Sequence, residues 1–163
     1  MDAYVSSGVI YFYQDQYADA EEVFNKVLAI QPDNYEALNW LGQVQIANYQ
    51  FVEGMKTYDK AIASDPLKTD VPFNKAGVLV QMGKFEEAAA ILSPFEQEDE
   101  SVKPTLAYIH YQMGEVDKGD KLLQDTVSRI PKMDRIEQAR AYFSVALAYS
   151  AKNEYSQARK YME

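Results

Sequence analysis

The sequence predicts an all-α protein built from repeated pairs of helices. The stretch from Tyr17 to Pro32 spaces its apolar side chains as a helix does and stops at a proline. Its leading aromatic residue returns twice at the same interval, as Phe51 and Phe85. An interval of about 34 residues is the mark of stacked helical repeats, because one helix pair cannot bury its apolar face alone and packs against the next pair.

Each repeat has the pattern of a helix–turn–helix unit. In the first repeat, residues 2–14 place Tyr4 and Tyr11 on one helical face, and residues 18–30 form a second apolar stripe before Pro32. We therefore expect about ten antiparallel helices. A single array over residues 1–163 would then hold five repeats, at approximately 1–34, 35–68, 69–99, 100–138 and a truncated 139–163.

The third repeat is shortened. The step from its small residue Ala88 to the equivalent Gly119 is three residues shorter than the regular interval. Pro94 lies where the second helix should continue, and proline removes a helix hydrogen bond and clashes with the preceding turn. We predict that this helix ends near Ser93. The irregular junction that continues to Pro104 should bend the array, so that the last two repeats leave the path of the first three.

The following step, from Gly119 to Ala158, is five residues longer than the regular interval. We predict that the next helix starts early, near Asp134, and runs to about Ala151. The stretch 155–163 starts a further helix that lacks the usual stop, so it should fray or dock against another copy of the chain. The sequence is therefore expected to be an excised piece of a longer protein.

The units resemble the tetratricopeptide repeat, whose spacing is W-x2-L-G-x2-Y, then A-x3-F, then P. In the first unit the matching residues are Tyr4, Gly8, Tyr11, Ala20, Phe24 and Pro32. The resemblance covers essentially the whole chain. It implies a right-handed α-solenoid that binds a protein or peptide in a concave groove lined by the first helix of each repeat.

Composition excludes several classes of function. The formal net charge of −9 disfavours nucleic acid as a partner. The absence of cysteine rules out disulfides, thiol catalysis and cysteine-bound metals. No apolar run approaches the length of a membrane span, so we expect no direct membrane insertion. We expect a soluble chain and slightly favour the cytoplasm, although any targeting signal would lie outside these residues.

Catalytic residues, metal ligands and cofactors are not predicted, so we expect that the chain is not an enzyme. His110 is the only histidine, and the repeat register makes it a partly buried packing residue. Carboxylates gather in the first turns of second helices, where the helix dipole favours them. Nothing pairs them as an acid and a base.

The predicted ligand site is a stripe of aromatic and amide side chains along the first helices. Its residues are Phe12, Tyr13, Asn39, Trp40, Gln43, Phe73, Asn74, Tyr108, Tyr111 and Gln112. Aromatic side chains concentrate interface energy, and amides can bond a ligand backbone without selecting its sequence. The cation clamp with which some family members grip the C-terminal carboxylate of chaperones is missing. We expect a protein or peptide partner with hydrophobic anchors and neutral or basic flanks.

Three alternatives to this interaction module stay open. The first is a secretion chaperone. The first three repeats and the segment 70–73 resemble those of the small tetratricopeptide chaperones of type III export. The second is a scaffold that self-assembles through open repeat ends. The third is a regulatory arm of a larger enzyme.

Overall fold

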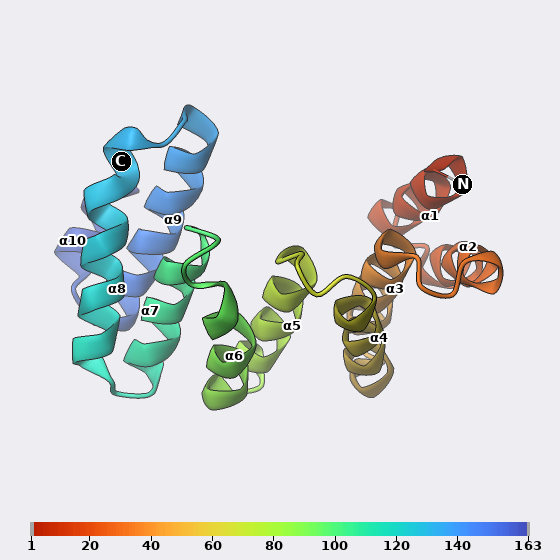
Figure 1. The fold of residues 1–163 in the computed structure, drawn as a ribbon, viewed down its shortest axis with the longest axis horizontal. Coiled ribbons are helices and arrows are strands. Elements are labelled where there is room, and N and C mark those ends of the chain that lie inside the picture. Colours follow the sequence, from red (N-terminus) through yellow and green to blue (C-terminus); the bar gives the residue numbers. More distant parts are fainter. Residues whose placement is uncertain (1, 163) are drawn as a thin grey trace. The chain divides into compact units, whose positions relative to one another are not determined.

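The computed structural model describes residues 2–162, and within them it contains helices and connecting turns but no strand (Figure 1). The prediction of an all-α fold is confirmed. The chain divides into two compact units, Met1–Lys75 and Ala76–Glu163. Each unit is described by itself below, and the single continuous array with a right-handed twist stays a prediction.

The first unit contains two complete helix pairs and the start of a third. The helices are α1 (Asp2–Tyr13), α2 (Tyr17–Ile30), α3 (Tyr35–Ala47), α4 (Phe51–Ser64) and the beginning of α5 (Asp70–Gln81). They pack in chain order, α1 on α2, α2 on α3 and α3 on α4 (Figure 1). The apolar faces of α1, α2 and α3 meet in one core cluster, made of Val5, Ala20, Phe24, Val27, Ala37, Leu41 and Val44.

The second unit contains the end of α5 and the remaining helices. These are α6 (Phe85–Leu92), α7 (Val102–Gln112), α8 (Val116–Arg129), α9 (Arg135–Ala151) and α10 (Tyr155–Lys160), with short 3₁₀ turns at Ser93–Phe95 and Ile130–Lys132. Helix α7 lies at the centre of the unit and packs on α6, α8 and α9, while α10 packs on α9 (Figure 1).

The same left-handed turn joins the two helices of every repeat. The residues with positive φ are Asp15, Tyr49, Gly83, Gly114 and Asn153, with φ between 57° and 77°. In each turn the next amide N–H bonds back to the carbonyl five residues earlier, as from Gln50 to Gln45 at 2.8 Å. This is the Schellman arrangement that ends a helix on a left-handed residue. The turns are evenly spaced as far as Gly83, then closer together, then further apart, so they repeat the irregular steps of the sequence.

Both irregular helix ends were predicted correctly. Helix α6 ends at Leu92, and Pro94 lies in the 3₁₀ turn that follows. Helix α9 begins after Asp134, whose carboxylate accepts the N–H groups of Ile136 and Glu137 at 2.8 Å each. Pro104, which was assigned to the junction, instead lies in the first turn of α7. This position suits proline because the first N–H groups of a helix have no partner within it.

Small residues allow the paired helices to approach closely. A Cβ atom placed on Gly42 of α3 would lie 2.5 Å from the ring of Tyr58 on α4, which is 2% exposed. In the second unit the roles are exchanged, since Gly119 lies on the second helix and the ring of Tyr111 comes from the first. In the pairs α1–α2, α3–α4 and α7–α8, one helix therefore supplies a glycine and the other fills the gap with an aromatic ring.

We expect Gly42→Leu to lower the free energy of unfolding by about 1–3 kcal/mol, because the added side chain overpacks a filled crossing. Gly77→Ala is the control, since no heavy atom lies within 4 Å of its Cβ position. Alanine favours a helix over glycine by about 1 kcal/mol, so this variant should be as stable as the parent or more so. Denaturant titration followed by circular dichroism measures both. Equal midpoints for Gly42→Leu and the parent would contradict the close crossing.

Candidate functional site

An aromatic cluster joins the C-terminal end of α1 to the middle of α3. The Trp40 ring lies edge to face with Phe12 at 5.6 Å and with Tyr13 at 6.1 Å between centroids. Such pairs are favoured by the ring quadrupoles. Phe12 and Trp40 are half-buried against the core, whereas Tyr13 is 73% exposed. The cluster therefore presents an oriented tyrosine ring to solvent on a packed aromatic base.

A row of side-chain amides lies beside this cluster and joins α3 to the start of α5. The Asn39 carbonyl oxygen accepts hydrogen bonds from the amide nitrogens of Gln43 and Asn74, both at 3.0 Å. The Asn39 amide nitrogen donates to Asp70 at 2.9 Å. Among the described residues, the carbonyl oxygens of the Gln43 and Asn74 side chains accept no bond. They can therefore accept N–H groups from a ligand backbone.

Asp70 lies at one end of the amide row, where hydrogen bonds from Asn39 and Tyr35 hold its carboxylate in place. Its second carboxylate oxygen accepts the hydroxyl of Tyr35, and the Tyr35 oxygen in turn accepts the backbone N–H of Val71 at 3.3 Å. Burial, and then the bond to Asp70, raise the pKa of the Tyr35 hydroxyl well above its usual range. Tyr35 therefore stays protonated and keeps donating. Sequence analysis missed Tyr35, although Tyr35 and Asp70 are the first residues of α3 and α5.

Seven of the ten predicted site residues lie in the first unit. We call them the first-helix face: Phe12, Tyr13, Asn39, Trp40, Gln43, Phe73 and Asn74. The other three lie on α7 in the second unit, where Tyr108 is half-buried and Gln112 is exposed. Tyr111 is 7% exposed, and its hydroxyl donates to Asp120 at 2.8 Å. Its ring fills the crossing of α7 and α8.

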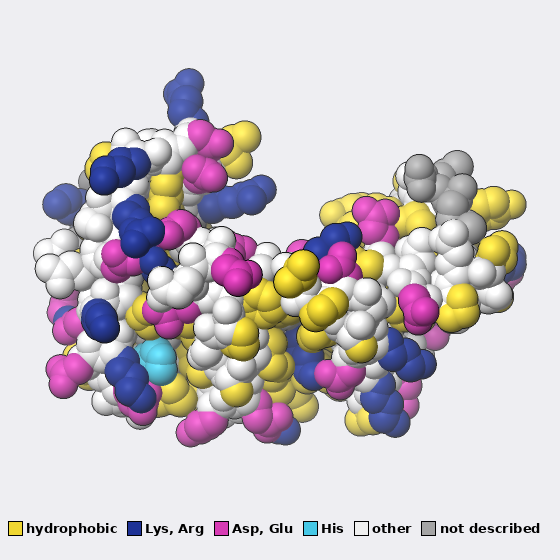
Figure 2. All heavy atoms as spheres, viewed as in Figure 1, with side chains coloured by type: hydrophobic (Ala, Val, Ile, Leu, Met, Phe, Trp, Pro, Cys, Tyr) yellow, Lys and Arg dark blue, Asp and Glu magenta, His cyan; other side chains and the backbone are white. Residues whose placement is uncertain are grey.

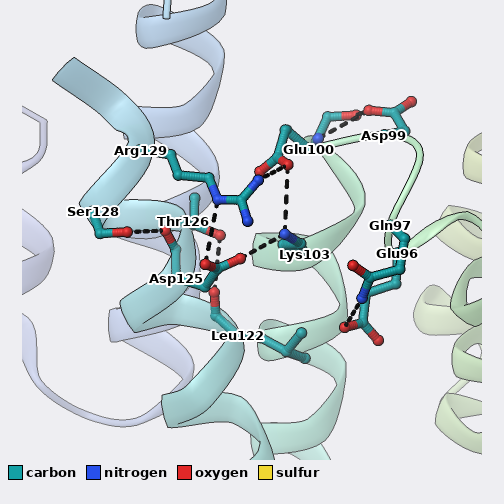
Figure 3. Close-up of polar contacts among 11 residues, drawn as sticks. Glu96, Gln97, Asp99, Glu100, Lys103, Leu122, Asp125, Thr126, Ser128 and Arg129 are labelled. Atoms are coloured by element: carbon teal, nitrogen blue, oxygen red, sulfur yellow. Dashed lines mark hydrogen bonds and ion pairs between the residues drawn. The ribbon is translucent and has the colours of Figure 1, made fainter. Parts of the chain in front are cut away.

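A charged cluster in the second unit brings together groups of the kind that a reaction centre would need (Figure 3). Lys103 is 3% exposed, and its ammonium lies 2.5 Å from Asp125 and 3.5 Å from Glu100. Arg129 pairs with both carboxylates, at 3.3 Å in the case of Asp125. Lys103 and Arg129 hold both carboxylates, while the second Glu100 oxygen is buried without a hydrogen-bond partner among the described residues. The cluster fastens the junction before α7 to α8.

His110 forms a separate polar contact with Glu115 at the turn between α7 and α8. It is half-buried, as predicted, and its Nδ1 atom lies 2.7 Å from a Glu115 carboxylate oxygen. Bonds from Lys118 and then from His110 lower the pKa of Glu115. Within residues 2–162 no group of three or more His, Cys, Asp or Glu side chains could hold a metal ion. The pair therefore has the geometry of a polar turn contact.

Comparison with known proteins places the chain in a family. Residues 13–95, just over half of the chain, match the family model described as "Anaphase-promoting complex, cyclosome, subunit 3". Residues 139–163 match the model described as "Tetratricopeptide repeat". The chain belongs to the tetratricopeptide repeat family, in agreement with the resemblance seen in the sequence. Membership of this family supports a protein–protein interaction module.

One curated relative is Superkiller protein 3 of Saccharomyces cerevisiae. It is 28% identical over 133 residues, which cover 76% of this chain and 9% of the relative. The chain therefore spans less than a tenth of the length of the curated relative that it matches.

Solved structures share the fold at low sequence identity. MamA superposes with a TM-score of 0.68 at 22% identity, over 99% of this chain and 87% of its own. The pilF protein of Pseudomonas aeruginosa gives 0.73 at 23%, over 98% and 72%. A tetratricopeptide repeat protein of Parabacteroides merdae gives 0.74 at 15%, over 98% and 63%. In the part of the chain that the structure describes, no helix has the length and apolar character needed to span a membrane.

We expect the charged cluster to make the free energy of unfolding depend on pH in the acidic range. The bond from Lys103, reinforced by the charge of Arg129, lowers the pKa of Asp125 in the folded state. The stabilisation is therefore present above the unfolded pKa of about 3.9 and is lost as the pH falls through the folded value. Because Asp125 is partly exposed, Asp125→Asn should cost about 1 kcal/mol near neutral pH. The difference from the parent should shrink as the pH falls toward about 3.

Denaturant titration across this pH range measures the effect. Glu98→Gln is the matched control, because Glu98 is an exposed acid of the same junction and none of the ion pairs in residues 2–162 includes it. Its stability should follow the parent at every pH. An Asp125→Asn curve parallel to that of the parent would show that the cluster contributes nothing.

Proposed function

We propose that the chain is a non-catalytic interaction module whose first-helix face binds an extended or helical segment of a partner protein. The supporting observation is that an aromatic contact and a hydrogen-bonding contact lie next to each other on α3. Trp40 belongs to the aromatic cluster, and the adjacent Asn39 is the centre of the amide row. A ligand that buries an apolar side chain against the rings would bring its backbone next to the open amide oxygens.

The geometry favours a ligand that is recognised by its backbone shape and by a few apolar anchor side chains. Tyr13 offers a large ring that is already oriented by its neighbours, so little side-chain entropy is lost on binding. The oxygens of Gln43 and Asn74 can accept N–H groups of any residue type. Phe73, half-buried on α5, adds an apolar contact next to Asn74. The buried Tyr111 has no part in this proposal.

The charge of the first unit determines which of these ligands would bind best. Residues 1–75 contain 11 Asp and Glu against five Lys and no Arg. An acidic segment would be repelled from this unit, whereas basic flanks would speed its association. We infer a partner with hydrophobic anchors and neutral or basic flanks. We also infer that the chain has no catalytic activity of its own, because the carboxylates of the charged cluster and of the His110–Glu115 pair are engaged by Lys, Arg or His side chains.

Peptide display against the purified chain tests this proposal without a known partner. Enriched peptides should share aromatic or large aliphatic anchors and carry more Lys and Arg than Asp and Glu. Tyr13→Ala and Trp40→Ala should weaken binding of an enriched peptide about tenfold or more, which corresponds to about 1.4 kcal/mol. Isothermal titration calorimetry measures this loss.

Val52→Ala is the control for these variants, because Val52 is 62% exposed on α4 and belongs to neither the cluster nor the row. Its affinity should equal that of the parent. Since Tyr13 is largely exposed, Tyr13→Ala should keep the fold, and circular dichroism checks this. If folded Tyr13→Ala and Trp40→Ala bind as tightly as the parent, the first-helix face is not the ligand site.

A further inference from the structure

The hydrogen bonds of the amide row all run in one direction, toward Asp70. Gln43 and Asn74 both donate to Asn39, and Asn39 donates to Asp70 at 2.9 Å. The second Asp70 oxygen accepts the hydroxyl of Tyr35, which is 8% exposed and belongs to the core. The outer ends of the row are therefore acceptors, and its inner end is a carboxylate that two neutral donors hold in a fixed position.

The charge of Asp70 is not paired with a cation. Asp70 is exposed, and none of the ion pairs in residues 2–162 includes it. Lys68 and Lys75, its nearest cations along the chain, each pair with another Asp. The helix dipole favours an acid at the start of α5, but it does not account for the two donors that orient this carboxylate.

A guanidinium group matches this arrangement of acceptors. Asn74 lies one helical turn after Asp70 on α5, and Asn39 joins both of them to Gln43 on α3. Each Asp70 oxygen accepts one bond and can accept another. Guanidinium carries five N–H donors in one plane and no acceptor, so a single group can bond a carboxylate and an amide oxygen together. Its bonds to a carboxylate are stronger than bonds between neutral groups.

No Arg of the chain occupies these acceptors. The four Arg residues of the chain lie within residues 129–159. Figure 2 shows Lys and Arg side chains gathered over the α8–α9 end of the second unit. Within residues 2–162, no hydrogen bond or ion pair joins an Arg to Asp70, Gln43 or Asn74. The acceptors are therefore open to an Arg of another molecule.

We propose that Asp70 and the open oxygens of Gln43 and Asn74 bind the guanidinium group of an Arg in the partner segment. The inference rests on the proposed function and makes it more specific, since it assigns the preference for basic flanks to one carboxylate beside the first-helix face. Trp40 directly follows Asn39 on α3, so the Arg lies close to the apolar anchor that the aromatic cluster receives. The ligand is therefore a segment in which an Arg neighbours an aromatic or large aliphatic residue.

Nuclear magnetic resonance with a small probe tests this site without a known partner. N-acetyl-arginine amide, the arginine probe, supplies the guanidinium group. N-acetyl-citrulline amide, the citrulline probe, has nearly the same shape and no charge. In the isotope-labelled full chain, the arginine probe should shift the side-chain amide signals of Asn39, Gln43 and Asn74, with a dissociation constant of about 1 mM or weaker. The citrulline probe at the same concentration should leave these signals unchanged.

Two matched variants separate the carboxylate from the overall charge. Asp70→Asn should weaken binding of the arginine probe about tenfold, because the charge is lost while an amide oxygen can still accept the Tyr35 hydroxyl. Glu36→Gln removes the same charge from an exposed residue in the first turn of α3, which none of the ion pairs in residues 2–162 includes. Its affinity should equal that of the parent. Asp70→Ser replaces Asp70→Asn if circular dichroism shows that the latter is unfolded.

Any of four results would overturn the inference. These are side-chain amide signals that do not respond to the arginine probe, an equal response to the citrulline probe, unchanged affinity of Asp70→Asn, and equal weakening by Glu36→Gln, which would indicate only general attraction by the acidic unit.

The inference and the proposed function fail separately. The arginine probe has no apolar anchor, so its binding is independent of Tyr13. If enriched peptides bind folded Tyr13→Ala and Trp40→Ala as tightly as the parent, the proposed function is wrong whatever the probe shows. If those peptides need Tyr13 and Trp40, but replacing their Arg by citrulline leaves the affinity of the parent unchanged, only the Asp70 site is wrong.

Discussion

The close approach of two helices at a small residue is the constraint on which the rest of this structure depends. Gly42 lets the ring of Tyr58 lie against the backbone of α3, and this contact fixes the depth to which α3 and α4 interlock. The same close approach recurs between α1 and α2, at Gly8 and Phe24, and with the roles exchanged between α7 and α8, at Gly119 and Tyr111. One local geometry therefore sets the crossing of three helix pairs in residues 2–162.

This constraint also determines which side chains remain for function. One side of each first helix packs against its partner helix. Residues on its other sides remain available for contacts with neighbouring repeats or with a ligand. In the first unit, Trp40 and Asn39 occupy such positions on α3. Each makes contacts to another first helix, Trp40 to α1 and Asn39 to α5. The candidate site is thus built from the same contacts that align successive repeats.

Charge is distributed unevenly along this regular framework. The first unit contains more Asp and Glu than Lys, while residues 130–162 contain more Lys and Arg than Asp and Glu. Between them in the sequence, Lys103 brings two carboxylates of different segments together and allows an acidic junction to fold against a helix. A net charge of −9 for the whole chain conceals this separation. A prediction based on the net charge alone would overlook the excess of Lys and Arg in residues 130–162.

The sequence alone determined the all-α fold and both irregular helix ends, because those depend on short-range chemistry. Pro94 removes a local hydrogen bond, and Asp134 caps a helix two and three residues away. The repeat register also assigned a helical side to each of the seven residues of the first-helix face, and their role as a ligand site stays a prediction. Only the tertiary structure decided which partners these side chains have. Tyr35 and Asp70 are separated by 35 residues, and Lys103 and Asp125 by 22. It likewise showed that Tyr111 fills a crossing, because the glycine there had moved to the second helix. Pairing across such distances follows from how the helices pack, and no local pattern in the chain encodes it.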